Sequence, residues 1–165
     1  MKPAYVVAPL ILLILTGLGA VVWLAPQSGD PAPDIAMTTL EGERFNLLDL
    51  RGRPVLVTFW ATNCPTCLAE MPHLAELHEE FGGQGLKVIG VAMHYDPEHR
   101  VRELVAQRGL PYRIVMDEDQ DIQRAFGEVR VTPTNYLISP RGRIVEREIG
   151  ELNRAALRDR LERML

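Results

Sequence analysis

A pair of cysteines between a predicted strand and a predicted helix constrains this chain more than any other feature. Residues 55–60, VLVTFW, form a continuous apolar run of β-branched and aromatic residues, typical of a strand buried on both faces. Cys64 and Cys67 follow shortly after, and apolar residues then recur at helical spacing until Gly82 and Gly83 end the pattern. A second apolar run at residues 86–93 completes a strand, helix, strand unit.

The rest of the chain continues this alternation. A short hairpin is predicted within residues 37–50, around the turn signal Glu41-Gly42. Further patterns predict a helix from Asp96-Pro97 to Gly109, a strand at 112–116, a short helix at 121–126, strands at 134–139 and 144–149, and a final helix at 152–165. These elements predict an α/β domain with a mixed central sheet flanked by helices and an N-terminal β-hairpin extension.

The N-terminal residues are expected to form one transmembrane helix. No charged residue lies between Lys2 and Asp30, and residues 4–25 can cross a hydrocarbon core about 30 Å thick at about 1.5 Å per residue. A cleaved signal peptide is the alternative, but the candidate cleavage sites carry bulky residues where small ones are preferred. We expect an anchor at 1–25, a linker at 26–33 and a globular domain at 34–165. The positive-inside rule places the N-terminus in the cytoplasm.

The charge distribution argues against nucleic acid as a partner. The chain carries 18 Lys and Arg against 22 Asp and Glu, a net charge of −4, without any run of five or more like charges. Phosphate binding needs a clustered basic surface, which this sequence does not show.

The spacing of the cysteines indicates redox chemistry. A bridge between Cys64 and Cys67 closes such a small loop that it stabilises a fold very little. Cys64 is expected at the start of a helix, with Pro65 at the first helical position, and a helix N-terminus favours the thiolate. We therefore expect Cys64 to be the nucleophile and Cys67 to resolve the mixed disulfide.

Metal binding is the main alternative use of the thiols. Cys64 and Cys67 would then form half of a metal site, and His73 or His78 on the following helix would complete it. Closed zinc sites, however, usually take four ligands from paired motifs. A second group of possible metal ligands comprises His94, Asp96, Glu98 and His99. The start of a helix at Asp96-Pro97 explains this group better than a metal site does. No metal ligand is therefore assigned.

The segment FWATNCPTCLAEMP, residues 59–72, resembles the active-site segment of thioredoxin-fold proteins. It is most similar to the membrane-anchored, periplasm-facing branch that includes the TlpA, ResA and cytochrome c maturation (CcmG/DsbE) oxidoreductases. Four further features match that branch across about residues 33–165: the helix proline Pro72, the cis-proline loop Val131-Thr132-Pro133-Thr134, Gly150 after the last strand, and the acidic residue Glu70.

The resemblance implies a thioredoxin-like fold and a thiol-disulfide oxidoreductase on a bacterial inner membrane, with its domain in the periplasm. It implies a cis peptide bond before Pro133, with Thr132 and Pro133 aligning the partner, and contacts to the partner from Asn63. Trp60 is expected either to contact partners or to lie in the core. Glu70 is expected to assist proton transfer with a pKa raised by partial burial.

The same resemblance implies that the protein reduces protein disulfides, in cytochrome c maturation or copper-site assembly. The electrons would come from a membrane donor of the DsbD/CcdA type, and no organic cofactor is needed because the dithiol carries both electrons. A copper-handling or metal-binding module of the same fold is the alternative.

The chain departs from related patterns at four positions. Thr58 stands where thioredoxins proper carry a buried aspartate, and Asn63 stands where the branch usually has a bulkier residue. A thiol peroxidase would need a threonine and a proline where this chain has Ala61 and Val57, which argues against that activity.

Overall fold

A computed structural model describes residues 29–165. The predicted membrane anchor at residues 1–25 lies outside the described residues. Between residues 29 and 165, no helix has both the length and the apolar character needed to cross a membrane.

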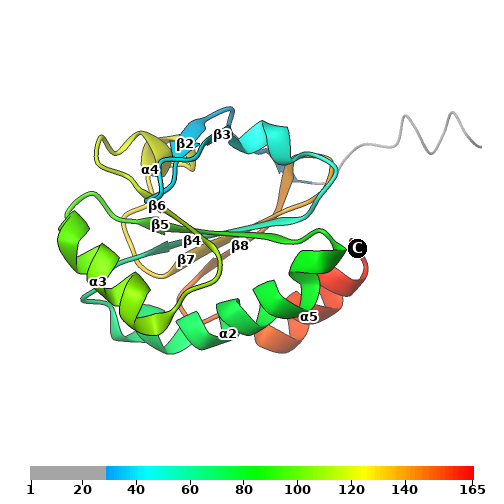
Figure 1. Cartoon of the computed structure of the whole chain (residues 1–165). Helices are drawn as coiled ribbons and strands as arrows, with labels where there is room; N and C mark the ends of the chain where they lie inside the picture. The colour runs from blue at the N-terminus through cyan, green and yellow to red at the C-terminus, as the bar shows by residue number, and fades with distance from the viewer. Residues whose placement is uncertain (1–28) are drawn as a thin grey trace, which may run out of the picture.

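One mixed sheet of six strands forms the centre of the domain, in the order β1-β8-β7-β4-β5-β6 (Figure 1). The strands β4, β5 and β6 run parallel to one another, whereas β7 is antiparallel to β4 and β8 is antiparallel to β7. The strands span β1 Asp30–Pro31, β4 Val55–Trp60, β5 Lys87–Ala92, β6 Arg113–Met116, β7 Thr134–Ile138 and β8 Arg143–Ile149. The predicted α/β fold with a mixed sheet is thereby confirmed.

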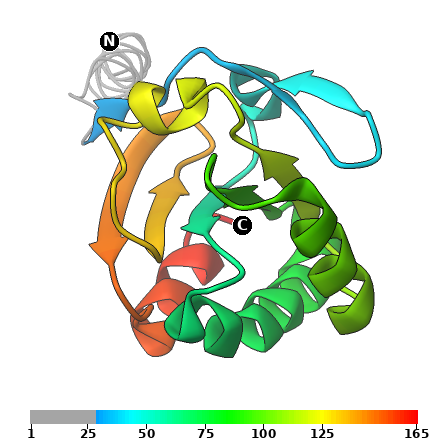
Figure 2. The ribbon, with the colours of Figure 1, turned by 90° about the vertical axis from the view of Figure 1, so that its left-hand side faces the viewer.

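Helices cover both faces of this sheet, as the alternation of side chains along β4 requires. Leu56 and Trp60 belong to the apolar cluster that includes residues of α2 Pro65–Phe81 and α5 Arg154–Glu162. Val57 and Phe59 belong to the opposite cluster, which includes residues of α4 Asp121–Ala125. In Figures 1 and 2, α2, α5 and α3, Glu98–Arg108, lie on one side of the sheet, and α4 lies on the other.

The predicted N-terminal hairpin is present but shorter than expected. The strands β2 Ala36–Thr38 and β3 Arg44–Asn46 pair antiparallel, and the chain then turns into a short 3₁₀ helix, η1 Leu47–Leu50. Asn46 causes this change because its side chain accepts a hydrogen bond from the Leu48 N–H, 2.8 Å away, and so caps the new helix. A second short 3₁₀ helix, η2 Gly82–Gln84, follows α2.

Residues 30–31, which lie in the predicted linker, form β1 and pair with β8. Gly29 precedes them where a Cβ atom would lie 2.1 Å from the Ile144 carbonyl oxygen, so only glycine fits beside β8. The last helix is also shorter than the predicted range, 152–165. It begins after Asn153, whose side chain accepts a hydrogen bond from the Ala156 N–H.

The proline inside α2 receives support from a neighbouring helix. Pro72 has no N–H, so it cannot donate to the Leu68 carbonyl one turn earlier. Arg108, in the last turn of α3, donates to that carbonyl oxygen over 3.0 Å. The active-site helix is therefore joined to α3 at the turn that follows the cysteines.

The strand register brings three loops to one edge of the sheet. The parallel strands β4, β5 and β6 end there, and β7 begins there because Thr134 pairs with Phe59, the next-to-last residue of β4. The loops 61–64, 93–97 and 127–133 therefore meet at this edge, which carries both cysteines.

Candidate active site

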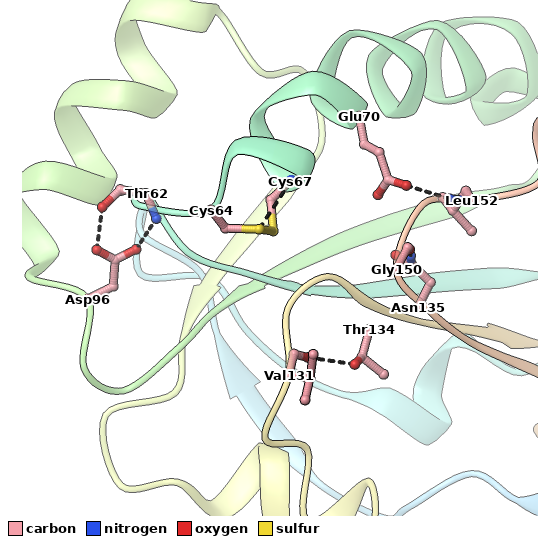
Figure 3. The surroundings of a disulfide bond; sticks show 10 residues. All are labelled: Thr62, Cys64, Cys67, Glu70, Asp96, Val131, Thr134, Asn135, Gly150 and Leu152. Carbon is pink, nitrogen blue, oxygen red and sulfur yellow. Dashed lines mark hydrogen bonds between the residues drawn. A yellow bond between two sulfur atoms is a disulfide. The ribbon is translucent and has the colours of Figure 1, made fainter.

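Cys64 and Cys67 form a disulfide at the first turn of α2 (Figure 3). Cys64 is the N-cap residue of this helix, Pro65 follows at the first helical position, and the Cys67 N–H donates to Cys64 Sγ over 3.2 Å. Cys64 is 9% exposed and Cys67 only 3%. Of the two cysteines, Cys64 is therefore the more exposed to a partner.

The position of Cys64 favours an ionised sulfur after reduction. The Cys67 N–H in the first turn of α2 donates to the Cys64 sulfur, and no acidic residue lies in this turn. Both this hydrogen bond and the partial positive charge of the helix end stabilise a thiolate. In this arrangement the more exposed Cys64 can attack a partner disulfide, and the more buried Cys67 can then attack Cys64 and displace the partner's sulfur.

Glu70 lies on α2, in the turn that follows Cys67, and is only 3% exposed. Its Oε1 accepts a hydrogen bond from the Leu152 N–H at 2.5 Å, whereas Oε2 has no hydrogen-bond partner among the described residues. Burial raises the pKa of Glu70, and the Leu152 N–H and the Asn135 side chain partly oppose this shift. The carboxyl therefore retains its proton to a higher pH than an exposed glutamate does.

A turn after β8 connects Glu70 with the loop that contains Pro133. The peptide bond between Thr132 and Pro133 is cis, which confirms the predicted geometry. The Gly150 N–H donates to the Pro133 carbonyl oxygen over 2.9 Å, and Leu152, two residues later, donates to Glu70. The loop before β7 and the acidic residue of α2 therefore share one short segment of backbone.

The predicted partner-binding residues differ in accessibility. Asn63 is exposed directly before Cys64, and Thr132 is half-buried in the loop before β7. Trp60, in contrast, is 2% exposed in the core, so the expectation that it contacts partners is not supported. Its indole N–H lies over Gly90, where a Cβ atom would come within 3.0 Å of Nε1. The apolar environment on the α2 side of the sheet explains why this side chain is buried.

Asp96, in the loop after β5, makes other contacts than the sequence predicted. Asp96 was expected to begin α3, but its carboxylate instead accepts two hydrogen bonds from Thr62, from the N–H and from the hydroxyl, each at 2.5 Å. The N-cap of α3 is Pro97, which provides no side-chain hydrogen bond. The sequence contains no local signal for a contact between residues 34 positions apart.

Two exposed apolar side chains at this edge were also missed. Tyr95, in the loop after β5, is 51% exposed, and Val131, in the loop before β7, is 54% exposed. His94 packs edge-on against the ring of Tyr95, and its own Nδ1 lies 3.1 Å from the Gln123 side chain. These contacts hold Tyr95 at the edge that carries the disulfide.

The two histidines considered as metal ligands, His73 and His78, contact residues other than the cysteines. His73 contacts Glu76 across 3.4 Å on α2, and His78 packs near Tyr112, with ring centroids 6.5 Å apart. Desolvation lowers the pKa of His78. In residues 29–165, no three His, Cys, Asp or Glu side chains are grouped so that they could hold a metal ion.

Comparison with known proteins agrees with this geometry. Residues 28–147 match the model of the AhpC/TSA family. The thiol-disulfide oxidoreductase ResA of Halalkalibacterium halodurans is 35% identical over 136 residues, covering 82% of this chain and 76% of that protein. The ResA of Bacillus subtilis is 27% identical over 91% of this chain and 87% of that protein.

Solved structures show the same fold. A thiol:disulfide interchange protein of the thioredoxin family from Chlorobium tepidum superposes with a TM-score of 0.75, covering 85% of this chain and 99% of that chain. It is 24% identical, so this similarity supports the fold alone.

Proposed function

The chain belongs to the AhpC/TSA family and is a thiol-disulfide oxidoreductase of the ResA/DsbE type, and from this premise we propose that it reduces protein disulfides in the periplasm. The observation that carries the proposal is the disulfide at the N-terminus of α2, with Cys64 more exposed than Cys67. A helix N-terminus activates the first sulfur, and burial keeps the second available for resolution.

The reaction needs only the two sulfurs as electron carriers. In the reduced protein, the Cys64 thiolate attacks one sulfur of a partner disulfide, forms a mixed disulfide and releases the other partner sulfur as a thiolate. The Cys67 thiol then loses its proton and attacks Cys64, which forms the intramolecular disulfide and releases the second partner sulfur. Two electrons pass to the partner, and Cys64 and Cys67 are oxidised.

We assign to Glu70 the role of accepting the proton that Cys67 loses. It lies one turn beyond Cys67 on the same helix, is buried, and has one carboxyl oxygen without a hydrogen-bond partner in the described part of the chain. A raised pKa brings a carboxyl closer to the pKa of a thiol, which favours proton transfer between the two. Glu70 therefore accepts the proton as Cys67 becomes the attacking thiolate.

The partner would bind across the edge where the three loops meet. Thr132 and Pro133 belong to the loop before β7, and main-chain groups of this loop would align an extended segment of the partner. Tyr95 and Val131 offer apolar contact area on the loops 93–97 and 127–133. These features suit a protein segment that carries a cysteine and apolar neighbours.

The location and the electron source complete the proposal. The apolar residues 4–25 would anchor the chain in a bacterial inner membrane, with the N-terminus in the cytoplasm and the domain in the periplasm. A membrane donor of the DsbD/CcdA type would return electrons to the disulfide. Substrates in cytochrome c maturation or copper-site assembly fit a reductant that acts in this oxidising compartment.

A trapping variant tests the proposal. In Cys67→Ser, the full-length protein should accumulate mixed disulfides through Cys64, and the Cys64→Ser/Cys67→Ser control should accumulate none. The reduction potential of the parent should lie near that of thioredoxin, about −270 mV. A potential near about −120 mV would contradict the reducing role. Stoichiometric copper binding without trapped partners would support a metal-binding module instead.

A further inference from the structure

Asp96 is a buried carboxylate that contacts the active-site loop rather than its own helix (Figure 3). Its Oδ2 accepts the Thr62 N–H and its Oδ1 accepts the Thr62 hydroxyl, each over 2.5 Å. A backbone hydrogen bond from the Asp96 N–H to the Met93 carbonyl oxygen, 2.9 Å long, closes the turn that places this carboxylate. Both carboxylate oxygens are therefore directed at the residue two positions before Cys64.

This use of Asp96 is not what local energetics would favour. An aspartate near the start of a helix usually satisfies the free N–H groups of the first turn. The first turn of α3 receives no such side-chain hydrogen bond, even though Asp96 lies next to its N-cap, Pro97. The loop geometry directs the carboxylate toward Thr62 instead.

The charge of Asp96 has no cationic partner among residues 29–165. The ion pairs in this part of the chain involve other acidic residues, and both hydrogen-bond donors to Asp96 are neutral groups of Thr62. The backbone from Thr62 to Cys64 spans about 7 Å at most, so one short loop separates this charge from Cys64. Because Asp96 is buried, salt screens its charge less than it screens a surface charge.

We propose that Asp96 is a positioning residue that holds the loop before Cys64 and, through its charge, opposes ionisation of the reduced Cys64 sulfur. The N-terminus of α2 favours the thiolate, and Asp96 counteracts it from the opposite side of the loop. A less stable thiolate makes the dithiol less stable relative to the disulfide, which makes the pair a stronger reductant. This inference deepens the proposed function, because it names the residue that keeps the potential low.

The isosteric variant Asp96→Asn tests the charge. Its side-chain carbonyl can still accept one hydrogen bond from Thr62, so the loop retains a contact while the charge is lost. In the full-length protein, we expect iodoacetamide to alkylate reduced Cys64 several times faster at neutral pH. At about pH 8, close to the ordinary pKa of a cysteine thiol, the equilibrium constant for reduction by glutathione should rise about three- to tenfold, a tenfold change being about 30 mV.

Two controls separate charge from position. Thr62→Val removes the hydroxyl hydrogen bond but leaves the Asp96 charge in place, so it should not raise the potential. Asp159→Asn removes an exposed carboxylate on α5 and should leave both the alkylation rate and the potential at the parent values. If Asp96→Asn does not fold, Asp96→Ser removes the same charge with a smaller side chain and should shift the potential in the same direction.

Three results would overturn the inference. These are an unchanged or lower potential in the folded Asp96 variant, a slower alkylation of Cys64, or an equal rise in potential in Thr62→Val. The proposed function is judged separately, by the absolute potential of the parent and by the partners trapped with Cys67→Ser. The role of Asp96 is judged by the difference between variant and parent.

Discussion

Two substitutions of Glu70 separate the effect of its ionisable carboxyl group from the effect of its hydrogen bond with the Leu152 N–H. Glu70→Gln removes the ionisable group but keeps a carbonyl oxygen that can accept the Leu152 N–H. Glu70→Ala removes that acceptor as well and leaves the Leu152 N–H without its partner. Because Glu70 is almost fully buried, solvent cannot easily replace the lost contact.

The hydrogen bond sets the difference between the two variants. An unsatisfied buried donor costs about 1–3 kcal/mol, so Glu70→Ala should be less stable than Glu70→Gln by at least this amount, with a further loss from the vacated volume. Glu70→Ala should be less stable than Glu70→Gln at every pH, because neither variant titrates at this position.

The parent protein should differ from Glu70→Gln in its pH dependence. Burial raises the pKa of Glu70, so the folded state binds this proton more tightly than the unfolded chain does. The resulting stabilisation is fully present below the ordinary glutamate pKa and is lost as the pH rises through the raised pKa. The stability of Glu70→Gln relative to the parent should therefore increase as the pH rises above the ordinary glutamate pKa of about 4.3.

Urea denaturation of the oxidised full-length proteins at several pH values measures these differences. The same variants should be assayed for reduction of a protein disulfide, where loss of the proton acceptor should slow turnover by about 10²-fold in Glu70→Gln. A stability difference between parent and Glu70→Gln that stays constant with pH would refute the raised pKa. Unchanged turnover would refute the proton-transfer role.

Two further substitutions test the partner surface and the packing beneath the site. Tyr95→Ser should reduce kcat/KM for protein disulfides while leaving the reduction of a small disulfide and the potential unchanged; equal losses for both substrates would count against a docking role for this exposed ring. Gly90→Ala should cost about 1–3 kcal/mol in urea denaturation, because its Cβ would lie 2.8 Å from Ile114 and 3.0 Å from Trp60. Gly83→Ala, with open space around it, should be close to neutral, and similar losses in both alanine variants would contradict the packing argument.

Local patterns in the sequence determined most of the fold. The apolar run at residues 55–60 forms a strand buried along its whole length, and Pro65 and Cys64 begin the helix where predicted. Such features could be predicted because strand burial, helix starts and the spacing of two cysteines depend on residues close together in the chain. The resemblance in the cysteine segment also led to the cis bond before Pro133.

Tertiary structure decided how distant residues surround the sulfurs. Asp96 contacts Thr62 instead of capping α3, Leu152 donates to Glu70 across 82 positions, and Trp60 lies in the core rather than on the partner surface. The contacts of Asp96 and Glu70 leave no periodic or local signal, because each joins residues that are far apart in the sequence and that only the folded sheet and its helices bring together. The sequence by itself therefore identified the reactive pair, whereas the charges and hydrogen bonds around that pair followed only from the folded sheet.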